Sequence, residues 1–337
     1  MGIAVFIIFA LIIMPFFYGN TEDESSGISH YKSSILPVAG LICAPVVLIS
    51  GYNIVSDRLV SEYDSKASRN LETGILVGAE QRDIGPPDSP GAVLLVHGFL
   101  GAGNNFNNLP ERLAESGWRV RVMRLPGHGT TPHDLEKESP ESMIQAVEKE
   151  IEYLRQSHET VVMVGHSMGG TIGALIAAED KVDRLVLCAP YFSVTREWYY
   201  ILKPETWTHI SYPFVRWVYK SDAFIKVNNT EIRNNIVSYR WVPLHGVKIL
   251  TELGKRAISP DVPNRITCPV LLLHALGDEA ASPEASEAIY NAIKSSDKHA
   301  VWLQKSNHHI FWDYEHIAVI DEIVRFIGLP ENSGNSQ

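Results

Sequence analysis

Apolar residues along this 337-residue chain gather in short uninterrupted runs separated by amphipathic stretches. The runs 92–96, 160–164 and 270–273 contain almost no polar side chain, as is typical of strands buried on both faces of a sheet. Because predicted strands and helices alternate, the pattern predicts an α/β fold with a mostly parallel sheet covered by helices. Further strands are predicted at 119–123, 182–188 and 299–303.

An amphipathic helix is predicted between the strands 119–123 and 160–164. Ser139 suits the N-cap, and Pro140 suits the first helical position, where no backbone N–H is needed. A second amphipathic helix is predicted at 317–327. The apolar positions of the first helix recur every three or four residues and form one face: Ile144, Val147, Ile151 and Leu154.

The alternation of strands and helices holds over residues 90–190 and 265–330, which we predict to be the core. Residues 191–264 interrupt it and are predicted to form a helical cap, or lid, above the active site. Thirteen of the 31 aromatic residues lie between 191 and 241, so this lid is rich in apolar surface. Most of these rings are expected to pack the lid onto the core. Phe214 and Trp217 are predicted to line a substrate pocket.

Two hydrophobic segments are predicted within residues 1–55. Residues 2–18 and 35–51 carry no charge, and an acidic, serine-rich stretch separates them. Each is close to the shortest helix that crosses a bilayer, so two transmembrane helices are predicted. A cleaved signal peptide is the alternative for the first segment, although no basic residue precedes Lys32. Buried core helices are a further alternative for both.

The charges beside these segments favour one orientation. Arg58, Lys66 and Arg69 follow the second segment, whereas residues 22–24, between the two, are acidic. Because basic flanks tend to stay in the cytoplasm, a protein of the plasma or inner membrane is expected, multi-pass or signal-anchored, with its catalytic domain cytoplasmic. Residues 56–89 are predicted to be a linker followed by short edge strands.

Composition excludes several kinds of partner. The formal charge of −10 and the absence of basic clusters argue against nucleic acid. The thirteen histidines do not follow a metal-ligand spacing, so neither a metal nor another cofactor is expected. Cys188 ends one predicted parallel strand and Cys268 precedes the next, which places them at opposite ends of the sheet and argues against a disulfide.

The sequence GHSMGG at residues 165–170 lies between the strand run 160–164 and a helix-like stretch at 171–178. A strand that turns sharply into a helix holds its corner residue at strained dihedral angles, and flanking glycines let the backbones approach. This setting predicts a nucleophile elbow that presents the hydroxyl of Ser167.

The loop at residues 97–101, HGFLG, directly follows the strand run 92–96. In acyl transfer a carbonyl oxygen becomes negative, and backbone N–H groups stabilise it. One such group comes from the residue after the nucleophile and the other from an earlier loop, so the oxyanion hole is assigned to the amides of Met168 and Phe99. His97 is expected to brace this loop rather than to act as the base.

A candidate aspartate and a candidate base histidine follow Ser167 along the chain, in the order Ser, Asp, His. Asp278 follows a predicted strand and can orient a histidine, whereas the adjacent Glu279 is expected to be a solvated loop charge. His308 or His309 is expected to take the proton of Ser167.

These motifs resemble those of the α/β-hydrolase superfamily, and within it bacterial carboxylesterases and monoacylglycerol lipases. The resemblance covers about seventy per cent of the chain. The family places its histidine third in S-x-H-x-x-x-x-D, which selects His308 and leaves Asp313 as the expected N-cap of the last helix. The resemblance rests on HGFLG (97–101), RLPGHGTTPHDL (124–135), GHSMGG (165–170), GDEAASPEAS (277–286) and SNHHIFWD (306–313).

The sequence therefore predicts a membrane-tethered serine hydrolase with the triad Ser167, His308 and Asp278. Its expected substrates are carboxylic esters with an apolar acyl group, such as monoacylglycerols or lysophospholipids. One alternative is an amide or peptide hydrolase, because the same triad serves both reactions. Another is a binding module on the hydrolase fold without turnover, although such proteins usually lack a triad member.

Overall fold

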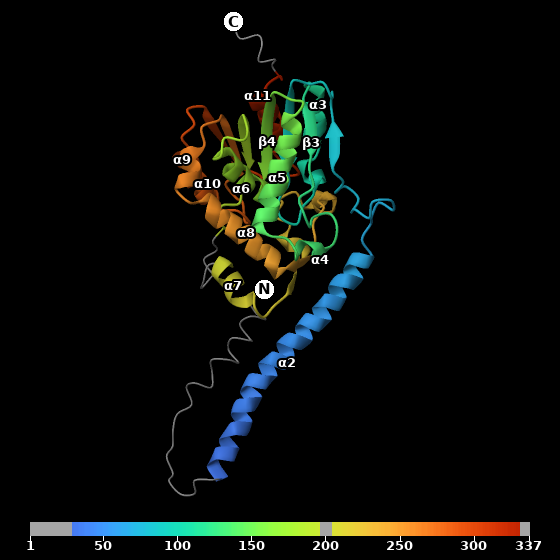
Figure 1. The fold of residues 1–337 in the computed structure, drawn as a ribbon, viewed down its shortest axis with the longest axis vertical. Coiled ribbons are helices and arrows are strands. Elements are labelled where there is room, and N and C mark those ends of the chain that lie inside the picture. The colour runs from blue at the N-terminus through green and yellow to red at the C-terminus, as the bar shows by residue number, and fades with distance from the viewer. Residues whose placement is uncertain (1–28, 196–203, 331–337) are drawn as a thin grey trace. The chain divides into compact units, whose positions relative to one another are not determined.

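The computed structural model describes residues 29–195 and 204–330 (Figure 1). The chain divides into two compact units, residues 1–62 and residues 63–337. Helix α2 (Ser29–Ser65) contains the hydrophobic segment 35–51, whereas the segment 2–18 lies outside the described residues. In the part of the chain that the structure describes, no helix is both long enough and apolar enough to span a bilayer.

A seven-stranded sheet forms the centre of the second unit, in the order β1-β3-β2-β4-β5-β8-β9. Only β1, at one edge, runs antiparallel to its neighbour. The six strands predicted from the sequence are confirmed to within two residues at each end. The strands are β1 (Arg82–Ile84), β2 (Gly91–Val96), β3 (Arg119–Val122), β4 (Thr160–His166), β5 (Arg184–Cys188), β8 (Val270–Ala275) and β9 (Lys298–Leu303).

Helices cover both faces of this sheet because the side chains of each buried strand alternate between two cores. In β2, Leu94 packs into one core and Val93 and Leu95 into the other. Figure 1 shows α5 (Pro140–Arg155) lying over β4, which it contacts. The first core includes residues of α5 (Pro140–Arg155), α6 (Met168–Ala177) and α10 (Pro283–Ala292), and the second includes residues of α3 (Leu109–Glu115) and α11 (His316–Ile327).

Helix α5 begins at the predicted cap. The Ser139 hydroxyl accepts the Ser142 amide and the Ser142 hydroxyl accepts the Ser139 amide, so two free N–H groups are satisfied at once. The predicted apolar face packs on the core, with Ile144 partly buried against it, and Met143 is a fully buried neighbour that the prediction omitted. The buried stripe therefore runs through Met143, Val147, Ile151 and Leu154.

The region predicted as a helical lid contains a small sheet as well as helices. Strands β6 (Trp217–Tyr219) and β7 (Trp241–Pro243) pair antiparallel, and α8 (Leu244–Ala257) packs on α6 of the core. Three-residue strands carry too little alternation to be read from sequence. The other described lid elements are α7 (Pro204–Ser211), η3 (Asp222–Phe224), η4 (Thr230–Asn235), α8 (Leu244–Ala257) and α9 (Asp261–Arg265).

Candidate active site

Ser167 is the single residue between the end of β4 and the start of α6. Its backbone has φ 53° and ψ −117°, a conformation that non-glycine residues rarely adopt. Its N–H donates to the carbonyl of Cys188 at 2.9 Å. A Cβ on Gly165 would lie 2.3 Å from the Gly169 carbonyl oxygen, and one on Gly169 would lie 2.0 Å from that of Val96. The two glycines are therefore required by the close approach of the backbones.

The structure brings Ser167, His308 and Asp278 together in one hydrogen-bonded chain. The Ser167 hydroxyl donates to His308 Nε2 at 2.9 Å, and His308 Nδ1 donates to Asp278 Oδ2 at 2.8 Å. Each follows the carboxyl end of a parallel strand, where such ends meet at one edge of the sheet. The distances suit proton transfer from the hydroxyl to the imidazole.

Asp278 is buried and surrounded by donors. Its Oδ1 accepts the amides of Ala280 at 2.8 Å and Ala281 at 2.9 Å, and its Oδ2 accepts His274 Nε2 at 3.1 Å as well as His308. Burial raises the pKa of this carboxyl group, but His308 and His274 outweigh that effect and hold the pKa well below its usual range. Asp278 is therefore ionised wherever histidine titrates.

The His308 backbone is held by a further histidine. His166 Nε2 donates to the carbonyl of His308 at 3.0 Å. Burial and the neighbouring His308 lower the pKa of His166 to about 3, so its ring is neutral near pH 7. His309 instead donates its backbone N–H to the carbonyl of Lys226 in the lid. Of the two histidines left open by the residues alone, His308 is the one that contacts Ser167.

The loop after β2 lies directly against the corner at Ser167. A Cβ on Gly98 would be only 2.9 Å from the Ser167 Cβ. His97 Nε2 accepts the Leu125 amide at 3.1 Å and Nδ1 donates to the Gly98 carbonyl at 2.9 Å, so this ring braces the loop. The amides of Phe99 and Met168 take part in none of the hydrogen bonds of the described turns and loops.

The lid is joined to this loop through Tyr239. Its N–H donates to the Leu100 carbonyl at 3.2 Å, and its hydroxyl accepts the Thr130 amide at 2.8 Å and donates to the Gly127 carbonyl at 3.1 Å. Its ring stacks on His128, with the centroids 6.5 Å apart. One lid residue thus fixes two loops of the core.

The two aromatic residues predicted to line a pocket lie in different environments. Trp217 begins β6 and is fully buried, with its ring 4.8 Å from that of His133. Phe214 precedes that strand and is 55 % exposed. Their part in substrate binding stays a prediction.

The sequence suggested Asp313 as the N-cap of the last helix, and this prediction is wrong. Helix α11 begins at His316, with Glu315 in the cap position. The buried Asp313 carboxylate instead accepts hydrogen bonds both from the lid and from the loop that carries His308, and so joins the two. A buried ion needs several such donors. It accepts backbone N–H groups from Asn228 (2.8 Å), Asn229 (2.9 Å), Asn307 (2.8 Å) and Tyr314 (2.9 Å).

Three further predictions concern Glu279, the two cysteines and metal ligation. Glu279 is about half exposed and pairs with Lys226 at 2.6 Å. Cys188 and Cys268 are free thiols. Within the described ranges, no three His, Cys, Asp or Glu side chains are grouped so that they could hold a metal ion.

Sequence reasoning missed His274 and His166. Each is a histidine within an otherwise apolar strand run, and His274 stands four residues before Asp278. A polar side chain at a position that must be buried signals a specific partner. The two histidines therefore indicated buried hydrogen bonds, but the sequence did not show which residues accept them.

Several known proteins are similar to this chain in sequence or in fold. The family model described as Hydrolase_4 (serine aminopeptidase, S33) matches residues 87–315, more than half of the chain. The chain is 27 % identical over 252 residues to a thermostable monoacylglycerol lipase of Bacillus sp. strain H-257, covering 75 % of this chain and 95 % of the lipase.

Two further proteins are similar to this chain. A carboxylesterase of Bacillus subtilis strain 168 is 25 % identical over 241 residues, which cover 70 % of this chain and 92 % of the esterase. The crystal structure of a monoacylglycerol lipase from Paleococcus ferrophilus superposes with a TM-score of 0.62 at 23 % identity, covering 73 % of this chain and 98 % of the lipase. The latter likeness shows the shared fold.

Proposed function

Because the chain belongs to the Hydrolase_4 (serine aminopeptidase, S33) family and is a serine ester hydrolase, we propose that it cleaves carboxylic esters whose acyl group is apolar. Monoacylglycerols and lysophospholipids are the substrate class. The relatives named as monoacylglycerol lipase and carboxylesterase support this choice, as does the aromatic content of residues 191–241. The hydrogen-bonded chain of Ser167, His308 and Asp278 carries the proposal.

The first half of the reaction forms an acyl-enzyme. Ser167 Oγ attacks the ester carbonyl while His308 Nε2 takes its proton, and the same imidazolium then protonates the leaving alcohol. The ionised Asp278 fixes the tautomer of His308 and stabilises its positive charge. General-base catalysis of this kind contributes roughly 10²- to 10⁴-fold.

The developing oxyanion lies at the amides of Phe99 and Met168. Met168 N–H is at the start of α6, where the helix leaves its first N–H groups unpaired. Each such donor contributes roughly 10²- to 10³-fold. A water molecule deprotonated by His308 then attacks the acyl-enzyme and releases the acid.

Replacing the nucleophile tests these roles. Ser167→Ala is expected to reduce kcat for a p-nitrophenyl ester by roughly 10⁴-fold or more and to abolish labelling by a fluorophosphonate probe. Circular dichroism checks that the variant is folded, and Ser116→Ala, at the end of α3, is the matched control. Labelling that survives in Ser167→Ala would contradict the assignment, and a wild-type protein without turnover would favour the binding module.

Acyl length tests the substrate class. A panel of p-nitrophenyl esters from acetyl to decanoyl is expected to give kcat/KM values that rise with chain length, since each buried CH₂ contributes about 0.8 kcal/mol. A preference for acetyl esters would overturn the apolar-acyl proposal and leave the esterase assignment intact.

An amide or peptide hydrolase is the second candidate, and the family description is the observation that favours it. Aminoacyl p-nitroanilides in the same panel distinguish the two reactions. We expect ester turnover to exceed anilide turnover at matched acyl groups, and the reverse order would establish a peptidase.

Membrane tethering through residues 1–55 is the remaining part of the proposal. The uncharged sequences 2–18 and 35–51 support it. The basic residues Arg58, Lys66 and Arg69 favour a cytoplasmic catalytic unit. Protease protection in sealed vesicles tests that orientation.

A further inference from the structure

The small sheet of the lid places a lysine on the face that packs against the core. The N–H of Lys220 donates to the carbonyl of Arg240, so the pairing of β6 with β7 continues one residue beyond Tyr219. Side chains alternate between the faces of a strand and paired residues share a face, so Lys220 lies on the same face as Val218 and Val242. Val242 belongs to the first core, whereas Tyr219, on the opposite face, is 54 % exposed. The Lys220 side chain is therefore directed beneath the lid.

Beneath the lid, Lys220 lies close to the histidines of the active site. The ring centroids of His308 and His309 are 5.6 Å apart. Burial is the main reason that the pKa of His309 is well below its usual range, and the charges of His308, His166 and Lys220 lower it further. The N–H of His309 also donates to the carbonyl of Lys226, six residues after Lys220. Lys220 thus borders the site at which the ester is attacked.

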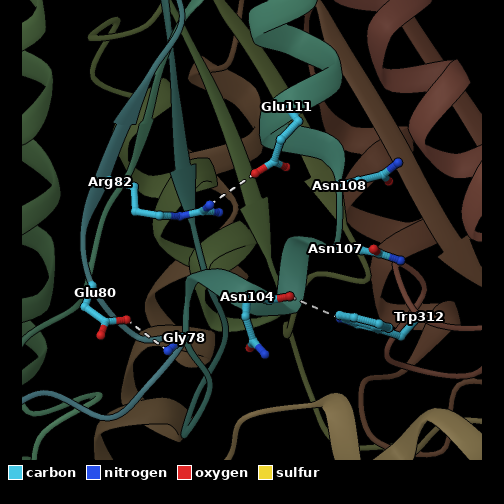
Figure 2. A pocket seen from close by; sticks show the side chains of 8 residues that line it. All are labelled: Gly78, Glu80, Arg82, Asn104, Asn107, Asn108, Glu111 and Trp312. Carbon is cyan, nitrogen blue, oxygen red and sulfur yellow. Dashed lines mark hydrogen bonds and ion pairs between the residues drawn. The ribbon is translucent and has the colours of Figure 1, made fainter. Parts of the chain in front are cut away.

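The ammonium group of Lys220 has a hydroxyl beside it where other cations have a carboxylate. Arg82 and Glu111 show the usual arrangement, since they face each other at 3.1 Å on the wall of a surface hollow (Figure 2). Among the residues that the structure describes, Lys220 Nζ donates only to the Ser238 hydroxyl, at 3.0 Å. The Ser238 oxygen accepts this bond, which leaves its own proton available to a further acceptor. The pair therefore offers donors without an anion.

A cation that is partly withdrawn from water normally has an anion beside it. Burial and the neighbouring Arg240 guanidinium lower the pKa of Lys220 to about 8, and no carboxylate of the described residues offsets them. The amine nevertheless remains mostly charged at pH 7. The closest carboxylate of β6 and its flanks, that of Asp222, pairs with Arg240 at 2.6 Å. Because Lys220 and Ser238 are both partly exposed, a ligand can supply the anion.

We propose that Lys220 and Ser238 bind the phosphate of a lysophospholipid, so that the enzyme prefers an acyl glycerophosphate to the neutral monoacylglycerol with the same acyl chain. An ammonium group suits phosphate as a compact point charge, and the hydroxyl donates to a second phosphate oxygen. The inference rests on the proposed function, because the phosphate arrives with an ester that Ser167 cleaves. Since the acyl group of that ester is apolar, the anion belongs to its alcohol side.

Turnover is measured on the full chain with 1-octanoylglycerol and 1-octanoylglycerol 3-phosphate, both below the concentrations at which they form micelles. The wild type is expected to cleave the phosphate ester with the higher kcat/KM. Lys220→Met should lower kcat/KM for the phosphate ester roughly tenfold or more and leave that for the neutral ester within about twofold. Ser238→Ala should lower the same ratio by a smaller factor, because the ammonium charge remains.

Two further lysine variants serve as controls. Lys220→Arg keeps the positive charge and should retain most of the preference for the phosphate ester. Lys248→Met removes an exposed lysine of α8 in the same lid and should leave both rates unchanged. An equal loss on both esters in Lys220→Met would show that Lys220 only supports the lid, and this result would overturn the proposal. A wild type that cleaves the neutral ester faster would also overturn it.

A binding measurement separates this inference from the proposed function. The ether 1-O-octylglycerol 3-phosphate has no ester to cleave, and we expect it to bind Ser167→Ala in isothermal titration calorimetry. Adding Lys220→Met should weaken that binding roughly tenfold or more. A protein without turnover on any ester, whose Ser167→Ala form still binds the ether through Lys220, would contradict the proposed function and support the phosphate site. Binding that is unchanged in Lys220→Met would overturn the site alone.

Two other sources of the anion are distinguished in the same assays. p-Nitrophenyl hemiglutarate carries a carboxylate on its acyl side, and p-nitrophenyl pentanoate is its neutral counterpart. A preference for the hemiglutarate that Lys220→Met removes would place the anion on the acyl side and overturn the assignment to the headgroup. Inhibition by inorganic phosphate that Lys220→Met relieves, without a preference for the phosphate ester, would assign the site to the free ion and likewise overturn it.

Discussion

Asp278 receives four hydrogen bonds, and one comes from a histidine that has no contact with the reacting atoms. His274 Nε2 donates to the same carboxylate oxygen as His308 and also lies 3.2 Å from the Ala281 carbonyl. Because Oδ2 must point at His308 for the triad to align, a second donor on Oδ2 fixes the plane of the carboxylate. His274 is therefore a positioning residue.

Replacing His274 tests this role. His274→Leu is expected to lower kcat roughly tenfold with little change in KM, since the loss falls on alignment rather than binding. The acid limb of the pH–rate profile should move to higher pH, because Asp278 with one donor fewer attracts the imidazolium proton more strongly.

His274→Gln retains an N–H donor at this position and should recover part of the lost rate. Equal impairment of the Leu and Gln variants would show that His274 only fills space.

Buried histidines make the fold sensitive to acid. Burial lowers the pKa of His97 to about 3, of His128 to about 4 and of His166 to about 3. The unfolded chain therefore binds protons near pH 6.5 that the folded chain refuses, so stability falls as the pH drops below that value. Each histidine contributes a slope of about 1.4 kcal/mol per pH unit.

His128 offers the clearest test, because its titration window runs from the ordinary 6.5 down to about 4. His128→Phe loses the bond to the Pro126 carbonyl and is expected to be less stable at neutral pH. Its free energy of unfolding should nevertheless fall less steeply with acid, by about 1.4 kcal/mol per pH unit. Urea unfolding at several pH values measures both effects, and parallel slopes for wild type and variant would contradict the account.

Among the elements, the lid is bound to the catalytic loops rather than resting on them. The segment 225–229 donates two amides to Asp313 and accepts the His309 amide through Lys226. The Asn228 side chain adds bonds to Lys305 and Asn307. The position of His308 therefore depends on this part of the lid.

Asp313→Asn tests that dependence. An amide group at this position has one acceptor oxygen for four N–H donors, so we expect a loss of about 1–3 kcal/mol in stability and roughly tenfold in kcat. Limited proteolysis should cleave the lid faster than in the wild type.

Glu315→Gln is the matched control, because Glu315 accepts N–H groups from Gln304 and Lys305 of the same loop but none from the described residues of the lid. Unchanged proteolysis in Asp313→Asn, or equal acceleration in Glu315→Gln, would argue against a link between lid and histidine loop.

The elements differ in how far the sequence predicted them. Buried parallel strands are long apolar runs, and the catalytic motifs directly follow them. Both could therefore be located from neighbouring residues in the sequence. The partners of Asp313 could not, because Asn228 and Asn229 lie about eighty residues earlier and meet it only in the fold. The strands β6 and β7 have three residues each and show no period.

For the whole molecule, the division at residue 62 separates the proposed tether from the catalytic unit. A chain of residues 63–337 contains every group of the triad and both cores of the sheet. We expect it to keep its kcat/KM for a water-soluble ester to within about a factor of two, because no catalytic group is removed.

The same truncation should move the protein from the membrane fraction to the supernatant after carbonate extraction. The full chain, carried through the same extraction, is the reference and should stay with the membrane. Release of the full chain by carbonate would contradict tethering by a transmembrane segment, whereas loss of activity on truncation would show that the first unit supports the fold of the second.

The backbone at Ser167 has one more consequence for the molecule as a whole. A non-glycine residue at such dihedral angles costs on the order of 1–3 kcal/mol, against a total stability that is typically about 5–15 kcal/mol. A laboratory selection for heat resistance alone would therefore favour glycine at position 167. It would yield a more thermostable protein that has no nucleophile. Selection for thermal endurance and selection for turnover thus oppose each other at this position, and only selection for turnover retains the serine.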